Sequence, residues 1–318
     1  MKKITGLVLA AAIHSIAFSA HADGKTIELV VPFATGGSTD VYARFLAKEL
    51  ATELKANLIV VNRPGAGGGV GAAAVARAVP DGKTILLGTI STHAINSWIY
   101  SSMPYDPAKD FTPVAKVVAM PNVLVVRAES PIKSVDDLVN ASKAKQLTFG
   151  SAGGGTTSNL AGELMKQVKP EMKLTHVPYK GSAPAITDLI GGHTDLQFDN
   201  LTSLLGQIQS GRLRALAVSS AQPSEQLPGV KPLAEQGFKG YDLQSWFGIF
   251  LPKGASAATV AELSEALKRA YAKPEFLQQI KAAGITPDLV LTPEFNRFVA
   301  AEQDKWGKVV KAAHIKLD

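Results

Sequence analysis

Short apolar runs alternate with longer amphipathic runs along most of this chain, and this alternation restricts the fold more than any other feature. A strand-type run covers Ile27 to Phe33, and the helix-type run that follows, Asp40 to Lys55, places Val41, Phe45 and Leu46 on one face. Such alternation is typical of α/β proteins with mostly parallel sheets buried on both faces. The next expected elements are a strand at Leu58–Val61, a helix at Gly71–Ala78 and a strand at Thr84–Gly88.

The alternation starts again near residue 120, where the segment MPNVLVVR predicts a strand ending at Arg127. Further strands are expected at Leu147–Gly150, Leu174–Tyr179, Thr194–Phe198 and Leu213–Val218, and helices at Ser158–Val168, Pro184–Ile190 and Leu201–Gln209. Another strand is predicted within Ser245–Ala255, followed only by helices, such as Ala257–Ala272 and Pro293–Ala312. Two similar units joined by two crossing segments predict two lobes with a cleft between them. Lobe 1 would comprise residues 23–122 and 246–318, and lobe 2 residues 123–245.

The first 22 residues are expected to be a signal peptide. Lys2 and Lys3 precede an apolar run from Ile4 to Phe18, and Ala20-His21-Ala22 gives the small-x-small pattern of a cleavage site. Later runs fall short of the roughly 18 apolar residues that a membrane-spanning helix needs. The chain contains no cysteine, which excludes disulfides, thiolate metal sites and a lipid-modified cysteine. We therefore expect a protein that diffuses freely in the periplasm.

Charge and motifs exclude several classes of function. The formal charge of +6 is spread along the chain without a cluster of lysine and arginine, which argues against nucleic acid and fits a modest preference for anionic ligands. Neither G-x-S-x-G nor H-E-x-x-H occurs, and His93 is expected to be a buried polar residue rather than a ligand. We expect no enzyme activity, no cofactor and no metal site.

The segment VPFATGGSTD, residues 31–40, forms the first candidate binding turn. Gly36 and Gly37 allow a ligand to approach the backbone closely, since they carry no Cβ. Ser38, Thr39 or Asp40 can cap the next helix, whose first N–H groups lie at the positive end of the helix dipole. This arrangement suits an anion, although the segment is no P-loop, because no lysine follows the glycines. The alternative is an ordinary turn capped by Asp40.

The segment FGSAGGGTTSNL, residues 149–160, repeats the same arrangement in the second unit. Three glycines follow a strand, and Thr156, Thr157 and Ser158 open a helix. Two such turns, each in one lobe, favour a clamp for an anion. The glycines of RPGAGGGVGA have the wrong spacing for a dinucleotide site, because Val70 stands at the third glycine position, so we interpret them as a structural turn. Asp199 and Asn200 can cap a helix or contact the ligand.

Six segments together resemble the Bug receptors, the TctC-type substrate-binding proteins of tripartite tricarboxylate transporters. The segments are VPFATGGSTD, VNRPGAGGGVGAAAVARAVPDGKTILLG, YDPAKDFTPV, GSAGGGTTSNL, VPYKGSAPAITDLIGGHTDLQFDN and GRLRALAVSS. The resemblance runs in order over essentially the whole chain after the signal peptide. It implies a two-lobed type II periplasmic binding protein fold that closes on a small carboxylate in a cleft between the lobes.

The resemblance also implies the site, the partner and the role. The expected role is to capture a dicarboxylate or aromatic carboxylate as a monomer and to deliver it to the membrane subunits of a tripartite tricarboxylate transporter. A sensory receptor and an exported α/β enzyme that uses the same cleft remain alternatives. The candidate ligand-binding residues are Phe33, Thr35, Gly36, Gly37, Ser38, Thr39, Asp40, Ser91, Thr92, Ser151, Gly154, Gly155, Thr156, Thr157, Ser158, Tyr179, Ser182, Asp199 and Asn200.

Overall fold

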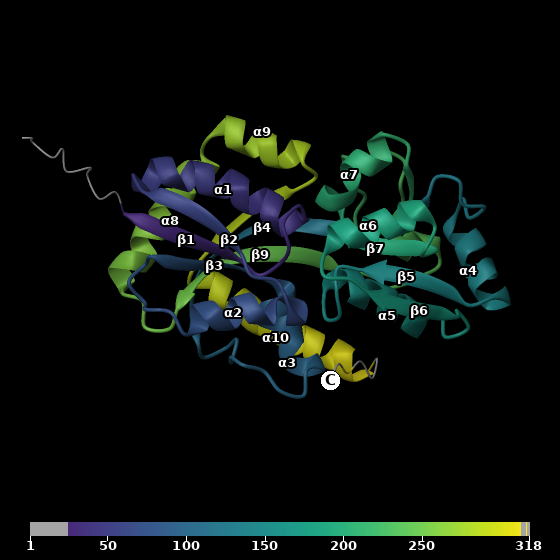
Figure 1. Cartoon of the computed structure of the whole chain (residues 1–318), viewed down its shortest axis with the longest axis horizontal. Helices are drawn as coiled ribbons and strands as arrows, with labels where there is room; N and C mark the ends of the chain where they lie inside the picture. Colours follow the sequence, from purple (N-terminus) through teal and green to yellow (C-terminus); the bar gives the residue numbers. More distant parts are fainter. Residues whose placement is uncertain (1–24, 313–315, 317–318) are drawn as a thin grey trace, which may run out of the picture.

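The protein forms two α/β lobes that lie end to end along its longest axis (Figure 1). The computed structural model describes residues 25–312 and residue 316, so the predicted signal peptide lies outside the described residues. Among the residues described, no helix combines the length and hydropathy needed to cross a membrane. The predicted α/β class and two-lobed arrangement are confirmed. The residue limits predicted for the lobes stay a prediction.

Lobe 1 is built around a sheet in which β2, β1 and β3 run parallel. These strands cover Asn57–Asn62, Thr26–Val31 and Thr84–Thr89. Apolar side chains on one face of the sheet pack against α1 (Ser38–Leu54), α8 (Ala257–Tyr271) and α9 (Pro274–Ala282). The other face is covered by α2 (Gly69–Ala76), α3 (Asn96–Ile99) and α10 (Glu294–Ala312). Both faces are therefore buried, as the continuous apolar strands predict.

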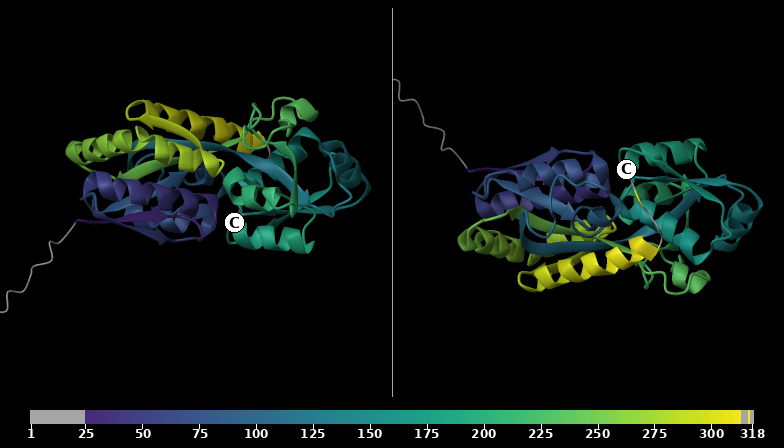
Figure 2. Two further views of the ribbon diagram at one scale, coloured as in Figure 1. Left: turned by 90° about the horizontal axis from the view of Figure 1, so that it is seen from above. Right: turned by 90° about the horizontal axis from the view of Figure 1, so that it is seen from below.

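Lobe 2 has the same layered design. Its parallel strands are β6 (Leu174–Pro178), β5 (Leu147–Ser151) and β7 (Leu196–Asn200), and β8 (Leu213–Val218) lies beyond them. On one face lie α4 (Val135–Ala144) and α5 (Thr157–Val168), and on the other α6 (Ser182–Gly191) and α7 (Leu201–Gln209). The two views of Figure 2 show helices on opposite sides of the strands in both lobes.

One long strand, β4 (Phe111–Arg127), passes from lobe 1 into lobe 2 (Figure 1). Its first part pairs with β9 (Gln244–Pro252), and from Asn122 onward it pairs with β7 and β8. At the crossing, the Asn122 N–H donates to Ser219 Oγ at 2.8 Å, and Ser219 Oγ donates to the Leu243 carbonyl at 2.6 Å. These bonds join the outgoing and the returning segments where the lobes meet.

Two details of the sequence-based prediction are wrong. The sheets are mixed rather than mostly parallel, because β4 and β9 run antiparallel to every strand with which they pair in the described chain. In addition, a strand, β10 (Thr286–Leu291), follows β9, where only helices were expected. It pairs with β4 at an irregular register, and Pro287 and Asp288 interrupt its apolar pattern. A short strand whose partner is distant in sequence gives no clear periodic signal.

Candidate functional site

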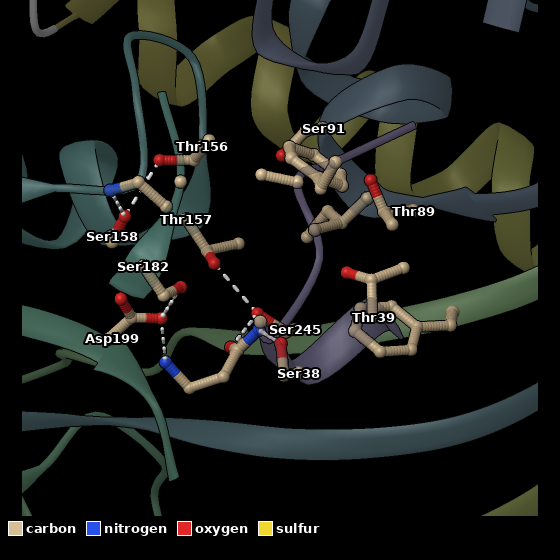
Figure 3. Close-up of a pocket in the computed structure, with 18 residues that line it drawn as sticks. Ser38, Thr39, Thr89, Ser91, Thr156, Thr157, Ser158, Ser182, Asp199 and Ser245 are labelled. Carbon is tan, nitrogen blue, oxygen red and sulfur yellow. Dashed lines mark hydrogen bonds between the residues drawn. The ribbon is translucent and has the colours of Figure 1, made fainter. Parts of the chain in front are cut away.

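A pocket lies between the lobes, close to the point where β4 and β9 pass from one lobe to the other (Figure 3). Its empty space is about 470 Å³ when the part open to solvent is counted. Its walls come from the ends of β1, β3, β5, β6 and β7, from the first residues of the helices after them, and from Ser245 and Phe247 of β9. The predicted residues that line it are Phe33, Gly37, Ser38, Thr39, Ser91, Thr156, Thr157, Ser158, Ser182, Asp199 and Asn200.

Four helices begin at the pocket. The residues that precede their first turns are Gly37 for α1, Thr156 for α5, Gly181 for α6 and Asn200 for α7, and all four line the pocket. The first N–H groups of a helix have no partner within the helix, and the dipole places partial positive charge there. Two of these helix starts were predicted as glycine-rich anion turns, and the structure brings the starts of the predicted helices after Gly181 and Asn200 to the same space. The pocket therefore attracts anions.

The hydroxyl groups on the lobe 2 side mostly bond to one another. Ser158 Oγ accepts from the Ala152 N–H at 2.9 Å and lies 2.8 Å from Thr156 Oγ1. Thr157 Oγ1 lies 2.7 Å from Ser245 Oγ, which donates to Asn200 Oδ1 at 2.6 Å. Figure 3 shows these bonds as two separate groups beside the cavity, one around Ser158 and one around Ser245. These hydrogen bonds hold the side chains in place and therefore fix the shape of this wall.

Three hydroxyl groups on the lobe 1 side have no partner among the described residues, whereas the fourth, Ser38 Oγ, accepts from Asn200 Nδ2. Thr39, Thr89 and Ser91 line the pocket, and none of their hydroxyls makes a hydrogen bond to another described residue. The Thr89 hydroxyl is fully buried without a partner, which is rare in folded proteins and costs stability. Figure 3 places these three side chains across the cavity from Asp199. These three hydroxyls therefore line the cavity without a hydrogen-bond partner among the described residues.

Asp199 is the only ionisable residue that lines the pocket. Its Oδ1 accepts from Ser182 Oγ at 3.0 Å and from the Asn200 N–H at 2.8 Å, and its Oδ2 accepts from Gln197 Nε2 at 2.9 Å. Burial raises the pKa of Asp199 to about 6, while these three hydrogen bonds oppose the rise. The neighbouring Gln197 Oε1 is buried without a partner, so a flip of this amide would give a protonated Asp199 an acceptor.

We expect Asp199 to make the protein less stable as the pH rises from about 4 to about 6. The pKa of about 6 in the folded protein exceeds the ordinary aspartate value of 3.8, so this carboxyl group favours the folded state below pH 3.8 and loses that contribution as the pH rises through 6. The Asp199→Asn variant keeps a neutral side chain throughout. Urea unfolding at pH 4 and pH 7 should show that the stability of the natural protein relative to the variant falls by about 2 kcal/mol. A constant difference would contradict this prediction.

The structure places eight predicted residues outside the lining. Thr35 and Gly36 are exposed, and Asp40 accepts from the Gly36 N–H, from Arg44 and from Asn62, so it braces the turn. The Thr92 hydroxyl bonds within its own turn to the N–H and carbonyl of Thr89. The others also have protein partners instead of facing the cavity. They are Ser151, bonded to His176 at 2.6 Å, Tyr179, bonded to Asp188 at 2.7 Å, and Gly154 and Gly155, which meet lobe 1.

Seven residues that line the pocket are not among the candidates named from the sequence. They are Ala34, Thr89, Ile90, Ala152, Gly181, Ser245 and Phe247. A usable signal existed for Thr89, because ligands of α/β proteins bind beyond the carboxyl ends of parallel strands and Thr89 is the last residue of β3. Ser245 and Phe247 gave no such signal. They reach the pocket because β9 returns between the lobes, and Phe247 with Phe33 adds aromatic surface to it.

Comparisons with known proteins identify the family of the chain. Residues 42–315 match the family described as tripartite tricarboxylate transporter family receptor, TctC. The protein BugT of Bordetella pertussis is 35% identical over 297 residues, which span 92% of this chain and 90% of BugT.

Two solved structures contain bound carboxylates. The Rpa4515 protein of R. palustris, solved with adipate, is 35% identical with a TM-score of 0.88, and the match covers 92% of this chain and 98% of that one. MatC from Rhodopseudomonas palustris, solved with bound malate, is 31% identical with a TM-score of 0.83, covering 90% and 98%. At this similarity the chain has the fold of the periplasmic binding proteins. These relatives are solute-binding receptors rather than enzymes.

Proposed function

Since the chain belongs to the tripartite tricarboxylate transporter receptor family, we propose that it is a periplasmic receptor for a small carboxylate, either a dicarboxylate or an aromatic carboxylate. The ligand binds between the lobes, and the loaded receptor, acting as a monomer, delivers it to the membrane subunits of its transporter. The adipate and malate bound to two relatives support this ligand class.

One observation carries the proposal. Four helix starts and three hydroxyls without protein partners meet in a pocket that contains no lysine, arginine or histidine. A carboxylate is the small ligand that such a set of neutral donors suits, because hydrogen bonds to a charged acceptor are the stronger ones. The donors are also fixed in place before the ligand arrives, which lowers the cost of ordering them.

The size of these effects indicates that the ligand needs more than one carboxylate contact. A hydrogen bond to a charged group contributes about 1.5–3 kcal/mol, and immobilising the ligand costs about 4–15 kcal/mol. Two or three bonds to one carboxylate would therefore roughly cancel the cost. Binding in the micromolar range, about −8 kcal/mol, calls for a second polar end or for apolar contact. Phe33, Ile90 and Phe247 supply apolar contact in the pocket.

A thermal-shift screen of the protein without residues 1–22 tests the proposal. The panel contains adipate, malate, benzoate, a tricarboxylate and, as matched controls, the corresponding amides or alcohols. A carboxylate present at about 100 times its dissociation constant should raise the stability by about 2.7 kcal/mol, while the neutral analogue should not. Titration calorimetry of the best ligand then gives the affinity. No response to any carboxylate, from a sample that native mass spectrometry shows to be free of ligand, would overturn the proposal.

A further inference from the structure

The glycine run Gly153–Gly155, just before α5, contacts lobe 1 beside the pocket. Tyr100 Oη, from the end of α3, donates to the Gly154 carbonyl at 3.2 Å. Gly155 is buried although it belongs to a loop at the edge of lobe 2, and its nearest side chain is Ile99. None of these four positions lines the pocket. The run is thus part of a contact between the lobes.

A side chain at this contact would force neighbouring atoms to move. A Cβ added to Gly155 would lie 2.5 Å from Ile99 Cδ1 and 3.0 Å from Asn96 Oδ1. Across the contact, a Cβ added to Gly67 would lie 3.0 Å from the Gly154 carbonyl. Carbon atoms that are not bonded to each other pack at about 3.5–4.0 Å. The glycines therefore let the backbone of lobe 2 reach lobe 1 in this conformation.

A second contact between the lobes lies near the start of α1. Asn200 Nδ2 donates to Ser38 Oγ at 2.7 Å, and the Ser38 N–H donates to Ser203 Oγ at 3.1 Å. A Cβ added to Gly181 would lie 3.1 Å from the Ala34 Cβ. The pocket is thus bordered by two direct contacts between the lobes, one at the start of α1 and one at the glycine run.

We propose that Gly155 and Ile99 are positioning residues for ligand capture, and that the run Gly153–Gly155 is a closing surface rather than a ligand-binding loop. The inference rests on the proposed receptor function. A ligand stabilises the closed conformation only through its differential affinity for that conformation, so any clash that opens the lobes lowers the apparent affinity. Gly155 and Ile99 thereby affect binding without contacting the ligand.

The test combines a clash with its repair. Gly155→Ala places a Cβ against Ile99 Cδ1, and Ile99→Val removes that same Cδ1 atom. We expect Gly155→Ala to weaken the binding of adipate by about 5- to 100-fold, since forced overpacking has effects of this size. The double variant should recover most of the loss. Titration calorimetry with adipate measures both, and malate replaces adipate if the natural protein binds malate instead.

Gly240→Ala is the matched control for backbone strain. Gly155 has φ +77° and Gly240 has φ +78°, but an added Cβ at Gly240 meets no atom within 4 Å. Both alanines therefore carry the same strain in the left-handed region, while only one meets the other lobe. Gly240→Ala should reduce thermal stability as Gly155→Ala does and leave the affinity unchanged.

A distance measurement reports closure independently of the ligand's identity. The chain contains no cysteine, so spin labels attached through Val79→Cys in lobe 1 and Val168→Cys in lobe 2, both exposed positions, give one distance between the lobes. We expect the Gly155→Ala variant to populate the short distance less than the natural sequence does, both without adipate and at the same subsaturating adipate concentration. Adding Ile99→Val should restore it.

The outcomes separate this inference from the proposed function. Adipate and malate can fail to change the distance between the labels and give no heat of binding, while Gly155→Ala still lowers the population of the short distance and Ile99→Val restores it. In that case the closing surface is supported and the proposed ligand class is wrong. If Gly155→Ala leaves both the distance and the affinity at their natural values, or if Ile99→Val repairs neither, the closing surface is wrong.

Discussion

Replacing Gly37 by valine is expected to abolish ligand binding while the protein still folds. Gly37 precedes the first turn of α1, lines the pocket and has φ −81°, a value that any residue adopts. An added Cβ would lie 3.7 Å from Ser182 Oγ and 3.8 Å from the Ala34 carbonyl, which are ordinary contacts. The two γ-methyl groups of valine extend beyond this point into the space between the lobes. We expect the affinity for the best carboxylate to fall by about 100-fold or more.

Gly37→Ala is the matched control, because its single Cβ fits. Its affinity should stay within about tenfold of the natural value. Both variants should lose about 1 kcal/mol of stability, since glycine is preferred to alanine or valine at this helix position. Titration calorimetry and urea unfolding measure the two effects separately. Unchanged binding by a folded Gly37→Val protein would show that the start of α1 does not contact the ligand.

Replacing Thr89 by valine is expected to weaken binding and to strengthen the fold. The Thr89 hydroxyl is buried in the pocket wall without a protein partner, and valine has nearly the same shape without the hydroxyl. Loss of one hydrogen bond to a carboxylate should reduce the affinity by about 10- to 150-fold. Removal of a buried polar group that lacks a partner should raise the free energy of unfolding by about 1 kcal/mol or more.

Thr194→Val supplies the control for this pair of effects. The Thr194 hydroxyl is also buried without a partner, but Thr194 lies outside the pocket. The substitution should raise the stability in the same way and leave the affinity unchanged. If Thr89→Val binds carboxylates as tightly as the natural protein, the lobe 1 hydroxyls are not ligand donors.

The sequence predicted those parts of the fold that depend on local patterns. The helix Leu201–Gln209 and the strand Leu213–Val218 begin and end at the predicted residues. The two glycine-rich turns do precede helices whose starts line the pocket. Strand pairing was harder to predict, because β4 and β9 are neighbours only through the folded arrangement of both lobes. The strand β10 was not predicted for the same reason.

The candidate site was predicted as far as it follows from single turns. Ser38, Thr39 and Thr156 could be named because a helix start carries its own signature of small polar residues. The sequence did not reveal which hydroxyls form hydrogen bonds within the protein. Ser158, whose hydroxyl is bonded, was therefore named as a candidate, and Thr89, whose hydroxyl has no partner, was not. Nor did it distinguish glycines that approach a ligand from those, such as Gly155, that approach the other lobe. Which lining residues bind the ligand stays a prediction.

The path of the chain through β4 and β9 has a consequence for the order in which the protein folds. Lobe 2 is formed by a continuous stretch of chain, whereas the sheet of lobe 1 needs β9, whose Phe250 pairs with Leu86. Contacts between residues so distant in sequence form slowly. As the chain is made from its N-terminus, lobe 2 can assemble first, while β3 keeps an unpaired edge until β9 follows. Such an edge can pair with other chains, so this interval is when the protein is most prone to aggregate.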